Sequence, residues 1–258
     1  MTEISGTVSG NPVPVLALES VDSTNSEARR LAESGDLGPR WITARVQTAG
    51  RGRRGRAWDT VEGNLAATLL MTTDRTPGDA ARTSFVAAVA VADALGAYLP
   101  DSLIRLKWPN DVLVDDRKIC GILIESGRIP GADRLWLAVG IGINLRHAPE
   151  AVDRPATCVA DHLRADVATP PTPGAALDGL ARAFAHRQGQ WDALGFDPIV
   201  EAWTGRAIGL GGPCAARLAT ETVEGVAEGL DPDGSLRLRL TDGGVRRIAA
   251  GDVFFGGR

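Results

Sequence analysis

An arginine- and glycine-rich stretch, Gln47 to Trp58, carries the residues of this sequence that are best suited to binding an anion. It reads Q-T-A-G-R-G-R-R-G-R-A-W and places four arginines among three glycines, in a chain with a formal net charge of -4. Glycine lets backbone amides approach a ligand closely. Guanidinium groups offer fork-shaped donors to carboxylates and phosphates. The stretch therefore predicts a tight loop around a small anion.

Three other anion-binding patterns fit the same stretch less well. Gly50, Gly52 and Gly55 match G-x-G-x-x-G, but a dinucleotide fingerprint needs these glycines to open an apolar helix, and residues 56–59 do not begin one. A phosphate loop would need G-K-S or G-K-T to follow, and neither does. Four arginines without interleaved aromatic residues or a helix-turn-helix make only a weak nucleic-acid patch.

Two further stretches have residue types that indicate a ligand. In the first, K-W-P-N-D-V (107–112) precedes Lys118, which starts the apolar run K-I-C-G-I-L-I-E. A buried ammonium group needs a partner, although a lysine at a strand start can also reach water. The second is G-I-G-I-N (140–144), where glycines within a strand indicate a close ligand or backbone, or relief of crowding between strands.

The elements that must position these stretches follow from hydrophobic periodicity and turn residues. The apolar runs predict strands at 13–18, 41–46, 64–71, 103–108, 112–114, 118–125 and 135–145, and helices at 80–99, 175–194 and 198–204. D-S-T-N (22–25) begins another helix, so helix capping explains Ser23, Thr24 and Asn25 as well as ligand binding does. Antiparallel strands with helices grouped around them predict an α+β fold.

The second half of the chain contains two segments whose sequence patterns differ from those of the first half. Residues 146–174 are rich in proline and charge and predict a long surface loop, with at most a short helix at 159–163, of the kind that often acts as a lid. Short strands at 214–218, 221–230, 236–240 and 245–249, separated by D-P-D-G and D-G-G turns, predict a small β-barrel. The expected domains are therefore residues 1–205 and 206–258.

Composition limits the remaining classes of function. With 258 residues, 44% of them hydrophobic, and a pI near 5.5, the chain lacks the basic character of a nucleic-acid-binding domain. The first residues do not resemble a signal peptide, and no apolar run reaches the roughly 20 residues of a spanning helix, so we expect a cytoplasmic protein without a membrane partner. The scattered cysteines and histidines predict no disulfide framework and no structural zinc, and no metal ligands are assigned.

Five motifs in a fixed order resemble the biotin protein ligase family, also called biotin–acetyl-CoA-carboxylase ligases. They are D-S-T-N, Q-x-A-G-R-G-R-x-G-R-x-W, K-W-P-N-D, R-K-I-x-G-I-L-I-E and G-I-G-I-N, all within the first 145 residues. The resemblance implies a catalytic domain like those of class II synthetases and lipoate ligases, with a mixed or antiparallel sheet and flanking helices, followed by an SH3-like β-barrel. Such enzymes use ATP and Mg²⁺ to form biotinyl-5′-AMP, and then transfer biotin to a lysine of the carrier protein or domain of an acetyl-CoA or acyl-CoA carboxylase.

The resemblance also implies roles for individual residues, carried over motif by motif. Catalytic roles fall on Lys118, Arg53, Arg51 and Asp111. Biotin contacts fall on Ser23, Thr24, Asn25, Gln47, Gly50, Arg51, Arg53, Lys118, Gly121 and Gly140. ATP contacts fall on Arg53, Arg54, Trp58, Asn110, Lys118 and Asn144. Asp111 is expected to position either Lys118 or the incoming lysine, and the loop position of Arg54 and Arg56 also suits exposure to solvent.

Three alternatives to this function remain open at this stage. Some family members carry an N-terminal winged-helix repressor domain, but only about twenty residues precede D-S-T-N here, too few for a domain of roughly 50, so DNA binding is not expected. A lipoate or octanoyl ligase would have a related fold, but it lacks the R-G-R-x-G-R and K-W-P-N-D stretches. The third alternative is a non-enzymatic anion-binding module. We expect a monomer or a weak homodimer.

Overall fold

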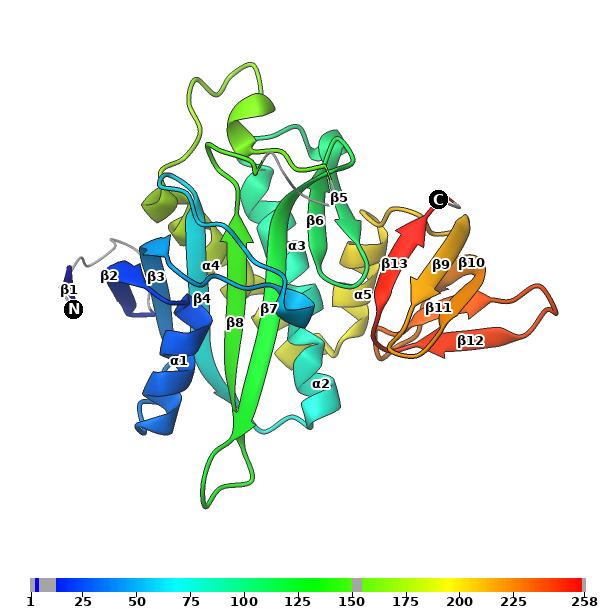
Figure 1. Ribbon diagram of the computed structural model, residues 1–258, viewed down its shortest axis with the longest axis horizontal. Helices are drawn as coiled ribbons and strands as arrows, with labels where there is room; N and C mark the ends of the chain where they lie inside the picture. The colour runs from blue at the N-terminus through cyan, green and yellow to red at the C-terminus, as the bar shows by residue number, and fades with distance from the viewer. Residues whose placement is uncertain (1–2, 5–12, 150–154, 257–258) are drawn as a thin grey trace.

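The larger part of the protein is built on one mixed β-sheet (Figure 1). The computed structural model describes residues 3–4, 13–149 and 155–256, so most of the segment used in the signal-peptide argument, and residues 150–154 of the predicted lid, lie outside the described residues. The sheet has eight strands in the order β1-β2-β3-β4-β8-β7-β6-β5. Their bounds are β1 Glu3–Ile4, β2 Val15–Val21, β3 Arg40–Gln47, β4 Leu65–Thr73, β5 Ile104–Lys107, β6 Asp111–Val114, β7 Arg117–Arg128 and β8 Leu135–Ile143.

Helices cover both faces of this sheet. Helix α1 (Thr24–Glu33) connects the parallel pair β2 and β3, whereas every other neighbouring pair in the sheet is antiparallel. It buries Ala28 against Leu18 and Ile42 on one face, while α3 (Thr83–Leu95) and α4 (Pro173–Leu194) lie on the other (Figure 1). Strand β8 runs between β4 and β7 and is buried throughout, which explains its unbroken apolar sequence.

The helix predicted at 80–99 is in fact two helices. Helix α2 (Pro77–Ala81) starts earlier than predicted because the Thr76 hydroxyl accepts a hydrogen bond from the Asp79 amide (3.2 Å), and Arg82 separates α2 from α3. Helix α3 then ends at Leu95, before the glycine at position 96. Residues 86–92 are fully buried, because α3 packs against the sheet on one side and against α4 and α5 (Asp197–Thr204) on the other.

The described part of the segment 146–174 is not simply a surface loop. Ala156 forms a parallel bridge with Lys118, and the Lys118 carbonyl accepts a hydrogen bond from the Thr157 amide (2.9 Å). Thr157, Cys158 and Val159 are buried, and a single 3-10 turn (Val159–Asp161) follows in place of the predicted helix. These residues are buried because they extend the sheet beside the start of β7, where the backbone of Lys118 needs a partner.

The C-terminal part is a separate five-stranded antiparallel sheet, as predicted for a small β-domain. Its order is β12-β11-β10-β9-β13, with β9 Pro213–Arg217, β10 Thr222–Leu230, β11 Leu236–Arg239, β12 Val245–Ile248 and β13 Asp252–Phe255. Strand β13, which pairs with β9, was not predicted. The indole of Trp108 donates a hydrogen bond to the Gly234 carbonyl (3.0 Å) and so fixes this sheet against the larger one.

Within the described residues, no helix combines the length and the apolar character needed to cross a bilayer. The three cysteines, Cys120, Cys158 and Cys214, are buried free thiols.

Candidate functional site

A cavity of about 350 Å³ opens where the N-terminus of α1, the loop between β3 and β4, and strands β7 and β8 meet. In Figure 1 this loop crosses the sheet from β3 toward the C-terminal sheet. Most of the predicted site residues line the cavity: Ser23, Thr24, Asn25, Gln47, Arg51, Arg53, Trp58, Asn110, Asp111, Lys118, Gly121, Gly140 and Asn144. Motifs that are far apart in the sequence therefore face one space.

Two predicted residues are not among those that line the cavity, Gly50 and Arg54. Gly50 closes the neck of the loop: its carbonyl accepts from the Trp58 amide (2.9 Å), and a Cβ at position 50 would lie 2.3 Å from the Trp58 carbonyl oxygen. Arg54 is exposed, has φ 56, and forms an ion pair with Asp252 (3.1 Å). Arg56 is also exposed as expected, but it too contacts Asp252.

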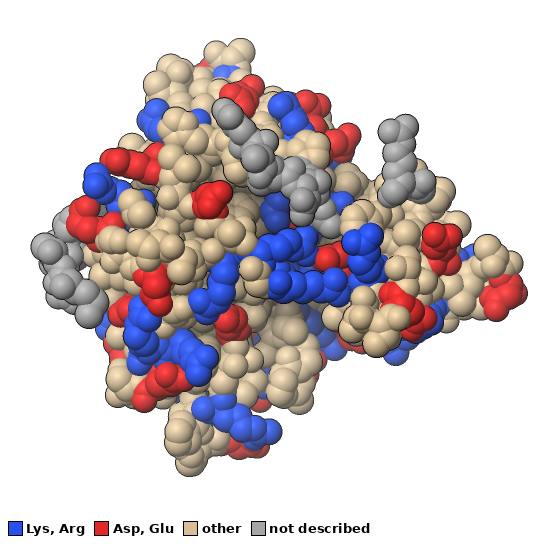
Figure 2. Space-filling model, in the orientation of Figure 1, with Lys and Arg blue, Asp and Glu red and all other residues tan. Residues whose placement is uncertain are grey.

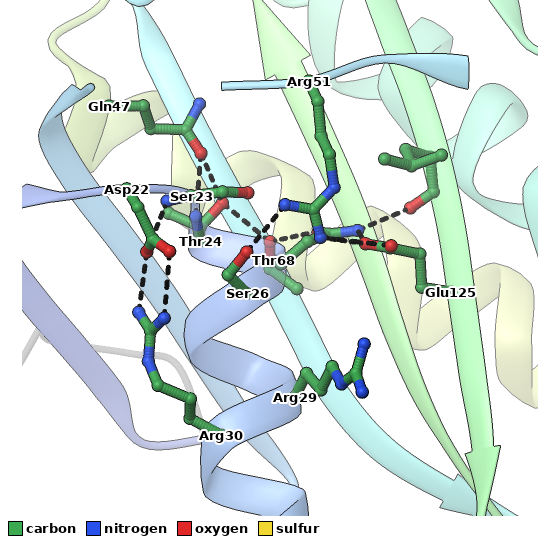
Figure 3. Close-up of polar contacts among 12 residues, drawn as sticks. Asp22, Ser23, Thr24, Ser26, Arg29, Arg30, Gln47, Arg51, Thr68 and Glu125 are labelled. Carbon is green, nitrogen blue, oxygen red and sulfur yellow. Dashed lines mark hydrogen bonds and ion pairs between the residues drawn. The ribbon is translucent and has the colours of Figure 1, made fainter. Parts of the chain in front are cut away.

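One end of the cavity is a buried network of short polar side chains (Figure 3). Ser23 is the N-cap residue of α1 but makes no side-chain capping hydrogen bond, so the capping explanation is wrong for it. Gln47 Oε1 accepts from both the amide (2.8 Å) and the hydroxyl (3.1 Å) of Thr24. Asn25 donates to Glu125 Oε2 (2.7 Å). Buried polar groups held in this way can direct donors and acceptors at a polar ligand.

Thr68 on β4 completes this network, and the sequence analysis missed it. Its hydroxyl is fully buried, donates to Asn25 Oδ1 (2.7 Å) and lies 2.8 Å from Thr24 Oγ1. The only available signal was a single hydroxyl in the otherwise apolar run L-A-A-T-L-L-M. Gly140 belongs to the same corner, because a Cβ there would lie 2.2 Å from Asn25 Oδ1. That glycine therefore makes room for a side chain.

Thr68→Val is expected to weaken ligand binding at this end of the cavity. The variant keeps the shape but leaves Asn25 Oδ1 without its donor, which costs about 1–2 kcal/mol, or roughly a 5- to 30-fold loss of affinity. Calorimetric titration with the ligand that is proposed below for this end of the cavity measures the loss of affinity. Thr43→Val is the matched control, because the Thr43 hydroxyl donates to the Ala66 carbonyl (2.9 Å) and not to Asn25. Equal losses in both variants would contradict the assignment.

The other end of the cavity carries cations. Lys118 Nζ lies 2.6 Å from Asp111 Oδ1, with the Asp111 side chain only 8% exposed, and 5.5 Å from the ring centre of Trp58. The ion pair explains how an ammonium group is accommodated at the start of an apolar strand. Figure 2 shows lysine and arginine side chains gathering where the large sheet meets the C-terminal sheet.

Arg51 and Arg53 are held by different parts of the fold. Arg51 donates to Ser26 Oγ (2.7 Å) and to Glu125 Oε1 (3.1 Å), which places it beside the polar network (Figure 3). Arg53 donates to Asn110 Oδ1 (3.0 Å) and to the Gly251 carbonyl (3.0 Å). Burial lowers the pKa of the Arg53 guanidinium below its ordinary value. A partly desolvated cation of this kind gains from a bound anion.

Trp58 covers two glycines of the central strands. A Cβ at Gly142 would lie 2.4 Å from the indole, and one at Gly121 would lie 3.0 Å from it. The glycines of G-I-G-I-N and R-K-I-x-G therefore allow an aromatic ring to lie close against the sheet. Asn144 and Asn110 tie strands to neighbouring segments, since their amides donate to the carbonyls of Thr157 (3.0 Å) and Ile122 (2.6 Å).

Gly142→Ala is expected to displace Trp58 and to weaken binding at the cationic end roughly tenfold or more, while leaving the polar network intact. Titrating the variant separately with the two ligands proposed below distinguishes the two ends. Gly189→Ala in α4 is the control, because a Cβ there meets no atom within 4 Å. Unchanged nucleotide affinity in the Gly142 variant would refute the role of the Trp58 position.

Comparison with known proteins agrees with this arrangement. Residues 17–144 match the model of the Biotin/lipoate A/B protein ligase family, and residues 209–256 match the Biotin protein ligase C terminal domain. The chain is 46% identical to a biotin–[acetyl-CoA-carboxylase] ligase of Paracoccus denitrificans, over 93% of this chain and all of that protein. It is 30% identical to the bifunctional ligase/repressor BirA of Bacillus subtilis, over 92% of this chain and 72% of that protein.

Solved structures show the same fold. The biotin protein ligase of Aquifex aeolicus in complex with biotin and ATP superposes with a TM-score of 0.76 at 24% identity, covering 94% of this chain and 99% of that one. The Leishmania major enzyme in complex with biotinyl-5-AMP gives a TM-score of 0.64 over 93% of this chain and all of that one. The family and fold predicted from the motifs are confirmed, and the chain belongs to the biotin protein ligase family.

Proposed function

We propose that the protein is an ATP-dependent ligase that activates biotin as biotinyl-5′-AMP and transfers it to a lysine of a biotin carboxyl carrier protein or domain. The observation that carries the proposal is the two-ended cavity. Its uncharged polar end, around Thr24 and Asn25, suits a ring with two N–H donors and one carbonyl. Its cationic end, around Arg53 and Lys118, suits a carboxylate meeting a phosphate.

Biotin would lie with its ureido ring at the polar end. Hydrogen bonds with Thr24, Thr68 and Glu125 already hold the side chains of Gln47 and Asn25 in place before the ligand binds. Fixed donors and acceptors reduce the entropy lost on association. Ser23 contributes a buried hydroxyl that α1 does not use for capping.

In the first step, the biotin carboxylate attacks the α-phosphate of ATP, and pyrophosphate leaves. Both reactants are anionic, so cations placed between them supply much of the reduction in barrier. Lys118, Arg53 and Arg51 all line the cavity and would supply these cations, Arg51 from the side of the polar network. Trp58, which lies close against Gly142, would offer an aromatic surface for adenine. Asn110 and Asn144 line the same end and complete the proposed nucleotide contacts.

In the second step, a carrier lysine attacks the acyl carbon of the mixed anhydride, and AMP leaves. The incoming amine must lose a proton, and Asp111 is the carboxylate beside Lys118. Water would destroy the anhydride, so the loop 50–58 and the segment 146–174 would have to exclude it. Residues 13–205 would form the catalytic domain and residues 206–256 the smaller domain. Since ATP is a substrate, the reaction would take place in the cytoplasm.

Mg²⁺ fits this cavity as a companion of ATP. Magnesium is usually held by one or two carboxylates together with substrate phosphates, and Asp111 and Asp252 are carboxylates that line the cavity. Among the described residues, no group of three or more histidine, cysteine, aspartate or glutamate residues could hold an ion alone. When bound, the ion would help to neutralise the pyrophosphate, with a carboxylate from this lining as its protein ligand.

Calorimetric titration with biotin, repeated with ATP and magnesium, tests the proposal. We expect biotin to bind alone and to be retained much longer after ATP is added, because the adenylate fills both ends of the cavity. Lipoate and octanoate, titrated in parallel, should give no heat. Binding of lipoate without biotin would replace the proposal with a lipoate ligase, and binding of neither would leave an anion-binding module.

A further inference from the structure

The tip of the arginine loop is fastened to the C-terminal sheet by one corner of β13. Asp252 accepts from both Arg54 (3.1 Å) and Arg56 (2.8 Å), and the neighbouring Gly251 carbonyl accepts from Arg53 (3.0 Å). We call these three contacts the loop latch. They join residues almost 200 positions apart in the sequence.

Beyond the side-chain hydrogen bonds of Arg51 and Arg53 described above, the segment that the latch holds makes mostly internal contacts. Residues 51–57 close on themselves through the bridge between Arg51 and Ala57 and the hydrogen bond from the Gly52 amide to the Arg56 carbonyl (2.7 Å). The 3-10 turn at the tip, η1 (Arg53–Gly55), buries no residue. Segments with few buried contacts open locally at low free energy. Contacts at the tip therefore decide how often this one opens.

Asp252 is well placed to act as a fixed anion. Its side chain is 13% exposed and lies between two guanidinium groups. Burial raises the pKa of the carboxyl, but the hydrogen bond from Arg56 and the charges of Arg56, Arg54 and Arg53 outweigh burial, so the pKa lies below its ordinary value. The carboxylate is therefore ionised at neutral pH and attracts the loop electrostatically.

We propose that Asp252 is a positioning residue, through which the C-terminal domain holds the arginine loop closed over the phosphate end of the cavity. The closed loop carries Arg53 and Trp58 but none of Ser23, Thr24 and Asn25. Opening of the latch should therefore speed release of the adenylate by a larger factor than it weakens biotin binding, because the polar end of the cavity stays in place. This consequence rests on the proposed function, whereas the latch itself does not.

Limited proteolysis with trypsin tests the latch without any ligand, because trypsin can cleave the loop after Arg51, Arg53, Arg54 and Arg56. Asp252→Asn removes the charge at constant shape and should speed cleavage within residues 51–57 roughly three- to tenfold. Asp231→Asn is the matched control: Asp231 is 17% exposed and also pairs with two arginines, Arg237 and Arg247, but both lie in its own domain. This control should cleave at the wild-type rate.

A second measurement separates positioning from general damage to the fold. In Asp252→Asn the dissociation rate of biotinyl-5′-AMP should rise several-fold more than the biotin dissociation constant, and Asp252→Glu should restore part of the retention. If Asp252→Asn does not fold, Arg56→Gln breaks the same ion pair from the loop side and is assayed at the Arg53 and Arg54 cleavage sites.

Wild-type cleavage rates in Asp252→Asn would overturn the latch, as would equal losses of biotin affinity and adenylate retention. If the wild-type protein binds no biotin, the proposed function fails, while the proteolysis comparison still decides whether Asp252 holds the loop.

Discussion

Lys118→Ala is expected to abolish biotin-dependent ATP–pyrophosphate exchange, with a loss of at least about 100-fold. Lys118 is the ammonium group at the cationic end of the cavity, and removing one preorganised charge from a site that excludes water typically lowers a rate by about 10²–10³. The variant also removes the ammonium group that pairs with the almost buried Asp111 carboxylate, so less positive charge remains where two anions must meet. Exchange of labelled pyrophosphate into ATP measures the effect.

Two controls separate this role from a folding defect. Lys107 and Lys118 are the two lysines of the chain, and Lys107 does not line the 350 Å³ cavity, so Lys107→Ala should keep exchange near the wild-type rate. Lys118→Ala should still bind biotin in calorimetry, because the polar end is intact. A near-normal rate of ATP–pyrophosphate exchange in Lys118→Ala would contradict the role assigned to Lys118.

Arg53→Gly is expected to weaken adenylate retention and to permit indiscriminate labelling of lysines. The guanidinium bridges Asn110 and the Gly251 carbonyl, so its removal takes away both a phosphate-facing cation and a tie between the loop and the C-terminal sheet. Loss of two charge-assisted hydrogen bonds should raise the adenylate dissociation rate roughly 10- to 100-fold. Released adenylate then reacts with any accessible amine.

Adenylate dissociation, followed with labelled biotin, and biotinylation of added serum albumin measure the two consequences. Serum albumin is added as a nonspecific acceptor because the protein itself has few lysines that released adenylate could label. Arg128→Gly, the same change at an exposed arginine at the far end of β7, is the control and should label only the carrier protein. An unchanged dissociation rate in Arg53→Gly would count against the role of this residue.

Motif spacing identified most of the cavity from the sequence because each motif is local. The apolar runs at 112–114 and 118–125 predicted two strands with only three residues between them, so Lys118 and Gly121 could be assigned to one strand and Lys118 expected near Asp111. The same logic placed the arginine loop at the end of a strand, where its residues can reach a ligand. These predictions needed no contact between distant segments.

Helix 80–99 shows where local patterns mislead. Alanine and valine on every side of α3 fit one long helix, but the break at Arg82 depends on the cap made by Thr76, and the burial depends on two other helices. Likewise, proline-rich composition predicted exposure for 146–174, whereas Thr157 and Val159 are buried against the start of β7.

By itself, then, the sequence determined the family, the α+β class and most of the charged and polar residues that line the cavity, because these are carried by short contiguous motifs. Only the tertiary structure decided which groups hold the site in place. Thr68, Glu125 and Asp252 contact residues that are 43 to 198 positions away in the chain. Contacts between such distant residues depend on the sheet order and on the docking of the second domain. The glycines of β7 and β8 illustrate the same difference. Their presence in the sequence indicated that some group packs closely against these strands, but only the fold showed that the groups are the side chains of Trp58 and Asn25.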